Sequence, residues 1–265
     1  MLGVFGEGGY DAEICLYTHG MRVFDWLRRS SDDESSGDDE VSENMTADQA
    51  LVGLREYAVG MIRPGFTDLD SILEAVHDSN DDEEVVLDAS IVDQMVREEW
   101  NKRLAELSLA NEKNLGNPDD YTRLSAAFSD LEKQGIVARM NFTCCQTCGH
   151  AEIDDERGHE ETEIGYVFFH QQDTERVADG DSSLYFAFGM FPDAPGIDQV
   201  LLKKAIDGDE DSDREIHEVV QARELTVANA LKDALTAHGF SVAWDGTVQQ
   251  RPSVLINDWR KPLPQ

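Results

Sequence analysis

Three cysteines fall within five positions of the chain, at Cys144, Cys145 and Cys148. Cys145 and Cys148 have the C-x-x-C spacing that lets two thiolates reach one zinc ion. His150 follows two positions later, and His170 ends a segment with strand-like composition. Thiolates and imidazoles are ligands that zinc prefers. The sequence therefore predicts a metal site drawn from these five residues, with zinc as the expected metal, although no second C-x-x-C pair is present.

Two other interpretations of the cysteines remain open. A C-x-x-C at the start of a helix favours a thiolate because helix amides stabilise negative charge, so Cys145 and Cys148 can form a redox-active dithiol. Cysteine is also among the most buried residue types, so the cluster can simply pack the joint between a strand and a helix. Both reactive interpretations require that the thiols reach solvent.

A histidine and a carboxylate lie close together in residues 170–173 (HQQD). These residue types suit general acid–base catalysis or metal ligation. On a regular strand, alternation places His170 and Asp173 on opposite faces of the sheet. We therefore interpret His170 first as a hydrogen-bonded core residue.

Aromatic and basic residues gather near the carboxyl end, at Trp244, Arg251, Trp259 and Arg260. An arginine stacked on a tryptophan would form a ligand platform. The plainer interpretation is that the tryptophans close a sheet and hold the terminus in place. The sequence contains no P-loop, G-x-G-x-x-G turn, G-x-S-x-G elbow or H-E-x-x-H helix that would name a reaction.

The apolar pattern predicts the elements that position these residues. Helical spacing indicates helices over 46–64, 67–76, 92–107, 117–135, 145–157 and 216–239. The third of these is predicted to carry one apolar stripe, formed by Val92, Val96, Trp100, Leu104 and Leu107. Alternating or aromatic segments indicate strands over 136–142, 165–171, 183–189, 240–244 and 254–256. The predicted fold class is α+β. A helical N-terminal region precedes a mostly antiparallel sheet with two packed helices, in the order β-α-β-β-α-β-β of a ferredoxin-like arrangement.

Three regions follow from this pattern. Residues 1–45 are predicted to be a disordered acidic segment, 46–115 a helical accessory region, and 116–262 the α+β domain with the cysteine cluster. Met45 directly precedes the first helix, which raises the hypothesis that translation begins there. The acidic runs at 78–84 and 207–213 are predicted to be solvated loops.

Charge sets the expected partners. The formal net charge is −33, from 55 acidic and 22 basic residues. Such a surface repels phosphate groups, so we expect neither nucleic acid nor a membrane as partner, and a protein or small molecule instead. The acidity fits either a cytoplasm of high salt or acidic inserts in an ordinary protein. No apolar run is long enough for a membrane span and no secretory signal is visible, so the expected location is the cytoplasm.

Two motifs resemble those of a known family. Residues 142–149 (FTCCQTCG) and 165–175 (GYVFFHQQDTE), with 136–139 (IVAR) and 244–246 (WDG), are similar to a bacterial, actinobacterial-type family catalogued as a domain of unknown function. The resemblance implies an intracellular bacterial protein and no assigned activity. The many acidic residues, the lack of a recognisable catalytic motif and the helical accessory region instead favour a binding or regulatory module with a structural metal at the cysteines. The alternatives are a metal- or thiol-dependent enzyme and a redox sensor that use Cys145, Cys148 and His170.

Overall fold

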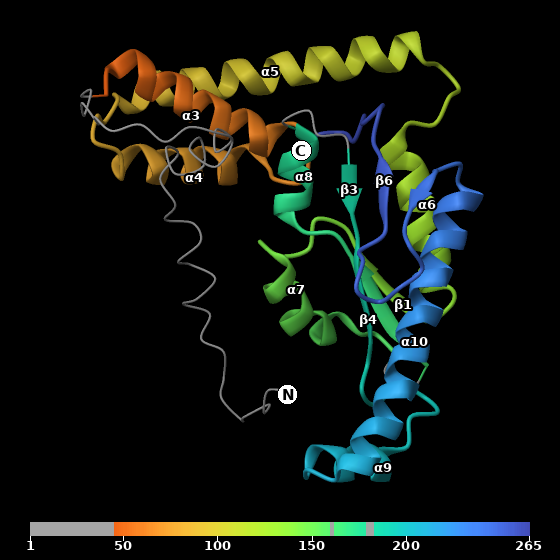
Figure 1. The fold of residues 1–265 in the computed structure, drawn as a ribbon. Helices are drawn as coiled ribbons and strands as arrows, with labels where there is room; N and C mark the ends of the chain where they lie inside the picture. The colour runs from red at the N-terminus through yellow and green to blue at the C-terminus, as the bar shows by residue number, and fades with distance from the viewer. Residues whose placement is uncertain (1–44, 160–161, 179–182) are drawn as a thin grey trace, which may run out of the picture. The chain divides into compact units, whose positions relative to one another are not determined.

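The structure, a computed structural model, describes residues 45–159, 162–178 and 183–265. The predicted disordered segment 1–45 therefore lies outside the described residues except for Met45. The described chain divides into two compact units. Residues 118–259 form one of them, and residues 45–117 together with 260–265 form the other (Figure 1).

The smaller unit is a set of three helices, α3 (Ala47–Ile62), α4 (Leu69–Asp81) and α5 (Ala89–Lys113). Each begins at a residue whose side chain accepts a backbone N–H of the first turn: Thr46, Asp68 and Asp88. Helix α3 packs against both α4 and α5 (Figure 1). The last residues of the chain join this unit, because Leu263 is buried in its core.

The predicted apolar stripe of α5 is confirmed at Val92, Val96, Trp100 and Leu107, which are all buried. Leu104 was expected on the same stripe and is 45% exposed. Steps of four residues advance a helix by about 400°, so Leu104 lies roughly 120° around the axis from Val92. A three-residue step then returns Leu107 to the buried side.

The larger unit contains the strands and the cysteine cluster. In chain order its elements are α6 (Asp120–Glu132), β1 (Ile136–Arg139), α7 (Gln146–Glu152), the 3-10 turn η1 (Ile153–Glu156), β2 (Gly165–Phe168), α8 (Gln171–Ala178), β3 (Ser183–Tyr185), β4 (Ala187–Met190), α9 (Gln199–Ile206), α10 (Glu210–Ala237), β5 (Val242–Ala243) and β6 (Ser253–Leu255). The α+β class with a helical N-terminal region is confirmed.

The strands form two small sheets. One has the order β1-β2-β4 and the other β3-β6-β5. Strands β1 and β2 are parallel, and the other three pairings are antiparallel, as the prediction of a mostly antiparallel arrangement required. The single sheet of a ferredoxin-like arrangement is not formed within the described residues, so that part of the prediction is wrong.

The strands separate into two sheets inside the segment 183–189, which was predicted to be one strand. Phe186 separates β3 from β4 and donates its backbone N–H to the carbonyl of Pro252 at 2.9 Å. Its fully buried ring packs with Phe128 and Phe169. The chain therefore passes from one sheet to the other at a core aromatic residue, which an alternating pattern cannot reveal.

The acidic runs expected as loops are partly helical. Helix α4 continues through Asp81, where the buried Asn80 exchanges hydrogen bonds with the backbone of Leu87 at 2.9 and 3.1 Å. Helix α10 begins at Glu210, and Asp209 caps it by accepting the N–H of Ser212 at 2.8 Å. Acidic residues at a helix start are favoured by the helix dipole, so charge runs there do not exclude a helix.

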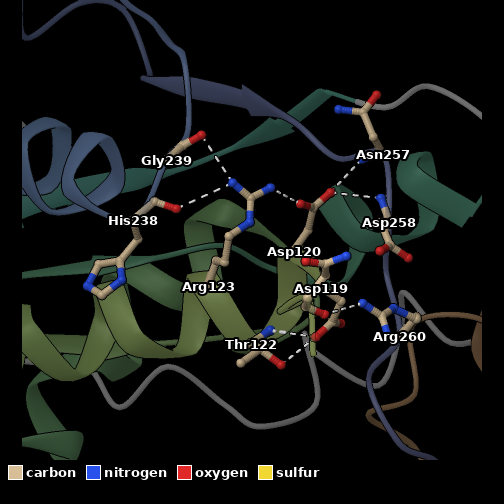
Figure 2. A network of polar contacts seen from close by, with 10 residues as sticks. Asp119, Asp120, Thr122, Arg123, His238, Gly239, Asn257, Asp258 and Arg260 are labelled. Carbon is tan, nitrogen blue, oxygen red and sulfur yellow. Dashed lines mark hydrogen bonds and ion pairs between the residues drawn. The ribbon is translucent and has the colours of Figure 1, made fainter. Parts of the chain in front are cut away.

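A buried carboxylate fastens the segment after β6 to α6 (Figure 2). Asp120 is 2% exposed and accepts the backbone N–H groups of Asn257 and Asp258 at 2.6 and 2.8 Å. It also pairs with Arg123, whose guanidinium stacks 4.3 Å from the Phe240 ring centroid. The Asp120 side chain is therefore satisfied by an ion pair and two amides, the condition for burying a charge. Within the described residues, no helix has the length and apolar character needed to cross a membrane.

Candidate functional site

The cysteines lie in a short turn held against the ends of two parallel strands. After β1, Asn141 and Thr143 adopt left-handed backbone conformations with φ of 52° and 55°. Such φ values are uncommon for residues with a side chain and rarer still for β-branched threonine. The turn is nevertheless fixed, because Phe142 donates its N–H to the carbonyl of Phe169 at 2.8 Å and Gln171 donates to the carbonyl of Thr143 at 3.1 Å.

Helix α7 begins inside the cysteine motif. Cys145 is its extended N-cap residue, and its carbonyl accepts the N–H of Gly149 at 3.0 Å. Gly149 is buried directly against the Phe168 ring, where an added Cβ would lie 2.4 Å from ring carbons. The glycine that follows Cys148 in the motif therefore allows α7 to approach β2 closely.

The three thiols converge. The sulfur atoms of Cys144, Cys145 and Cys148 all lie within 4.8 Å of one another, and the Sγ atoms of Cys144 and Cys148 are 3.5 Å apart. All three residues are half-buried, so the thiols are neither sealed in the core nor fully exposed. Burial raises the pKa of the Cys145 thiol, but hydrogen bonds from the Cys148 amide and from the neighbouring thiols outweigh it, and the pKa is lowered. The arrangement suits a thiolate that binds a soft metal ion or reacts with an oxidant.

His150 follows the cysteines on α7 and its Nδ1 lies 2.9 Å from the Tyr166 hydroxyl. Its ring packs edge-on against Phe168, with centroids 5.2 Å apart. Burial lowers the pKa of His150, and the positive charge of Arg251 adds to the effect. Burial likewise raises the pKa of Tyr166 to about 12. The His150 ring and the Tyr166 hydroxyl are therefore both uncharged in this contact.

His170 lies in a buried polar network. Its Nε2 is 3.1 Å from Oδ2 of Asp173, which also accepts the His170 backbone N–H at 3.2 Å. Arg251 donates Nη2 to the same oxygen at 2.6 Å and to the Tyr185 carbonyl at 2.9 Å. Burial lowers the pKa of His170 despite the opposing charge of Asp173. The Nδ1 atom of His170 is buried and has no hydrogen-bond partner among the described residues.

The prediction that His170 and Asp173 face opposite sides is wrong. Strand β2 ends at Phe168 and helix α8 begins at Gln171, so one helical turn brings residues 170 and 173 together. Arg251 joins them from a position 78 residues along the chain. No local spacing signals that contact, and its place in the sequence groups Arg251 with the tryptophans instead.

Of the five predicted ligands, the structure brings the three cysteines together. Within the described part of the chain, neither His150 nor His170 belongs to the group of ligand atoms that lie within 4.8 Å of one another. His150 is turned toward Tyr166 and His170 toward Asp173.

The tryptophans near the carboxyl end hold loops in place. Trp244 donates its indole N–H toward the carbonyls of Thr247 and Gln250, at 2.9 and 3.1 Å. Trp259 packs edge-on against Tyr121 with centroids 5.4 Å apart. In the helical unit, Arg260 donates to the Asn111 side chain at 2.9 Å. These contacts agree with the plainer interpretation of the tryptophans.

Comparison with known proteins gives a family and no activity. No curated protein matches the chain. No solved structure matches it either. A family model described as "Domain of unknown function (DUF6891)" matches residues 46–263, which is most of the chain and spans both described units. The chain belongs to this family, whose description assigns it no function.

Proposed function

We propose that this protein is a bacterial, cytoplasmic binding or regulatory module that holds one zinc ion at Cys144, Cys145 and Cys148. The observation that carries the proposal is the convergence of three sulfur atoms to within 4.8 Å of one another. In a tetrahedral site with Zn–S bonds of about 2.3 Å, the sulfurs lie about 3.8 Å apart. Because the 3.5 Å between Cys144 and Cys148 is already close to that value, small side-chain rotations suffice.

The surroundings of the thiols support metal binding. A cysteine must lose its proton to bind zinc, and the lowered pKa of Cys145 eases that loss. The turn is held by backbone hydrogen bonds to residues 169 and 171 and by the close packing of Gly149 on Phe168. A site held in this way loses little conformational entropy when the ion binds.

The net charge of the chain indicates which class of partner it can bind. With a formal net charge of −33, the chain repels polyanions. We therefore propose a protein or a small molecule, and not nucleic acid, as the species that the module binds.

A cobalt titration of the full chain under reducing conditions tests the proposal. We expect one Co²⁺ per chain with intense thiolate-to-cobalt bands, which Zn²⁺ displaces. Cys148→Ser abolishes or strongly weakens these bands, while Cys15→Ser, the matched control outside the cluster, keeps them. Reduced, folded protein that shows no thiolate bands would overturn the proposal.

The 3.5 Å between the Cys144 and Cys148 sulfurs favours a second candidate function, a redox sensor. A peroxide can oxidise one thiolate to a sulfenic acid, and a neighbouring thiolate then displaces the hydroxide to form a disulfide. The two thiols lose two electrons and two protons, and the peroxide is reduced to water when it is hydrogen peroxide. A metal-free protein that cycles between dithiol and disulfide would select this function over the first.

A further inference from the structure

We propose that Nδ1 of His170 is the fourth ligand of the metal held by the three cysteines, with Asp173 and Arg251 as positioning residues. This inference rests on the proposed function, because it concerns the coordination of the same ion. Structural zinc sites have four protein ligands, and the three cysteines supply only three.

The carboxylate beside the His170 ring indicates which ring nitrogen is available. The carboxylate of Asp173 can only accept, so Nε2, which lies 3.1 Å from it, carries the ring proton. In the neutral ring Nδ1 then carries a lone pair. That atom is buried without a hydrogen-bond partner among the described residues, on a residue that is only 5% exposed. Leaving a buried acceptor unsatisfied destabilises the folded protein, and a bound metal would remove that cost.

The groups around His170 match the outer shell of a histidine-ligated metal. Metal-binding histidines usually donate their other ring nitrogen to a carboxylate, which sets the tautomer and ring orientation. Asp173 is placed for this role, because its Oδ2 lies 3.1 Å from Nε2, and it is itself 2% exposed and hydrogen-bonded to Arg251 at 2.6 Å. The guanidinium compensates the charge of the buried carboxylate and restrains its position, so the His170 ring is held before any ion arrives.

Several hydrogen bonds join the segment that carries His170 to the turn that carries the cysteines. Gln171, the residue after His170, donates its N–H at 3.1 Å to the carbonyl of Thr143, the residue before Cys144. Thr174 of α8 donates its hydroxyl to the Asn141 side chain at 2.6 Å. The chain therefore brings the two parts of the site side by side.

The cysteine side chains are the ligands that we expect to move when a metal ion binds. The His170 ring nitrogens lie outside the group of ligand atoms within 4.8 Å of one another, so the ring and the cysteine side chains must come closer together to share an ion. The ring is buried and tied to Asp173, whereas the three cysteines are half-buried. We therefore expect the cysteine side chains to move toward the ring.

Cadmium NMR of the unmodified sequence tests this directly. The full chain, labelled with ¹⁵N-histidine, is reduced and loaded with one ¹¹³Cd²⁺. We expect a one-bond coupling between ¹¹³Cd and a single histidine ring nitrogen, Nδ1, and loss of that resonance in His170→Gln. Cadmium bound by thiolates with no histidine coupling, or with coupling that disappears only in His150→Gln, would overturn this inference and leave the proposed function standing. Absence of cadmium binding would overturn both.

Cobalt spectra of variants separate the ligand from its positioning residues. In His170→Gln we expect shifted ligand-field bands, because nitrogen is lost from the coordination shell. In Asp173→Asn we expect unchanged band positions but a zinc affinity weaker by about ten- to a hundredfold. His217→Gln, at an exposed position of α10, serves as the matched control and leaves both unchanged. Identical spectra for His170→Gln and the wild type, with both folded, would contradict the inference.

Discussion

The Sγ atoms of Cys144 and Cys148 lie 3.5 Å apart across the first turn of α7. Cys144 lies outside the C-x-x-C pair formed by Cys145 and Cys148, yet its sulfur lies beside that of Cys148. The cluster is therefore a group of three neighbouring thiols and not a dithiol pair with a separate third cysteine. A metal ion and a disulfide would compete for the same sulfur atoms.

That competition predicts protection by zinc. Treated with hydrogen peroxide, the metal-free protein is expected to form a disulfide within the cluster, and one equivalent of zinc is expected to slow this reaction. Mass spectrometry of the peptide containing residues 144–148 measures the loss of two hydrogen atoms. The Cys15→Ser variant is the control, since it keeps the full cluster. Equal oxidation rates with and without zinc would contradict a shared site.

Gly149→Ala is expected to loosen α7 and weaken metal binding. The new Cβ would lie 2.4 Å from carbons of the Phe168 ring, so the helix or the ring must shift. Overpacking of this kind typically costs about 1–3 kcal/mol. Urea denaturation of the full chain measures the loss. Gly158→Ala is the matched control, because nothing lies within 4 Å of its added Cβ. Equal stability of the two variants would show that the close approach is not needed.

Asp120→Asn is expected to lower the free energy of unfolding by about 3 kcal/mol, the typical cost of breaking a buried ion pair. The change removes the charge that Arg123 and two backbone amides satisfy (Figure 2). Asp154→Asn, at a side chain that is 70% exposed, is expected to cost less than about 1 kcal/mol. Chemical denaturation measures both variants, and similar losses would contradict the role of Asp120.

The carboxyl group of Glu224 is expected to make the free energy of unfolding depend on pH. Burial raises the pKa of this carboxyl above 4.5, against the opposing charge of His217. The folded state then holds the proton more tightly than the unfolded state, so the free energy of unfolding falls as pH rises from about 4.5 through the folded pKa.

Glu224→Gln removes this contribution. We expect the variant to match the wild type near pH 4 and to exceed it at pH 7, by less than about 1 kcal/mol because the side chain is only half-buried. Urea titrations from pH 4 to pH 8 measure the difference. Glu218→Gln, at an exposed position of the same helix, is expected to show no such trend, and a wild-type profile for Glu224→Gln would contradict the assignment.

Local features were predictable from the sequence. The positions of α3 and α4 follow from apolar spacing, although the cap of α4 is Asp68 and not the expected Thr67, and the cysteine cluster follows from its motif. Contacts across long stretches of chain were not predictable. Arg251 lies just before β6 and meets Asp173 across 78 residues of chain, and residue types alone do not encode such pairings. The face of His170 was mispredicted because period-two alternation stops where a helix begins.

The most direct test of the central claim is the zinc content of the full chain, purified under reducing conditions without an affinity-metal column. Elemental analysis by mass spectrometry is compared between wild type, Cys148→Ser and Cys15→Ser. We expect about one zinc per chain in the wild type and in Cys15→Ser, and much less in Cys148→Ser. Wild-type protein that carries no zinc and takes up none when zinc is added would contradict it.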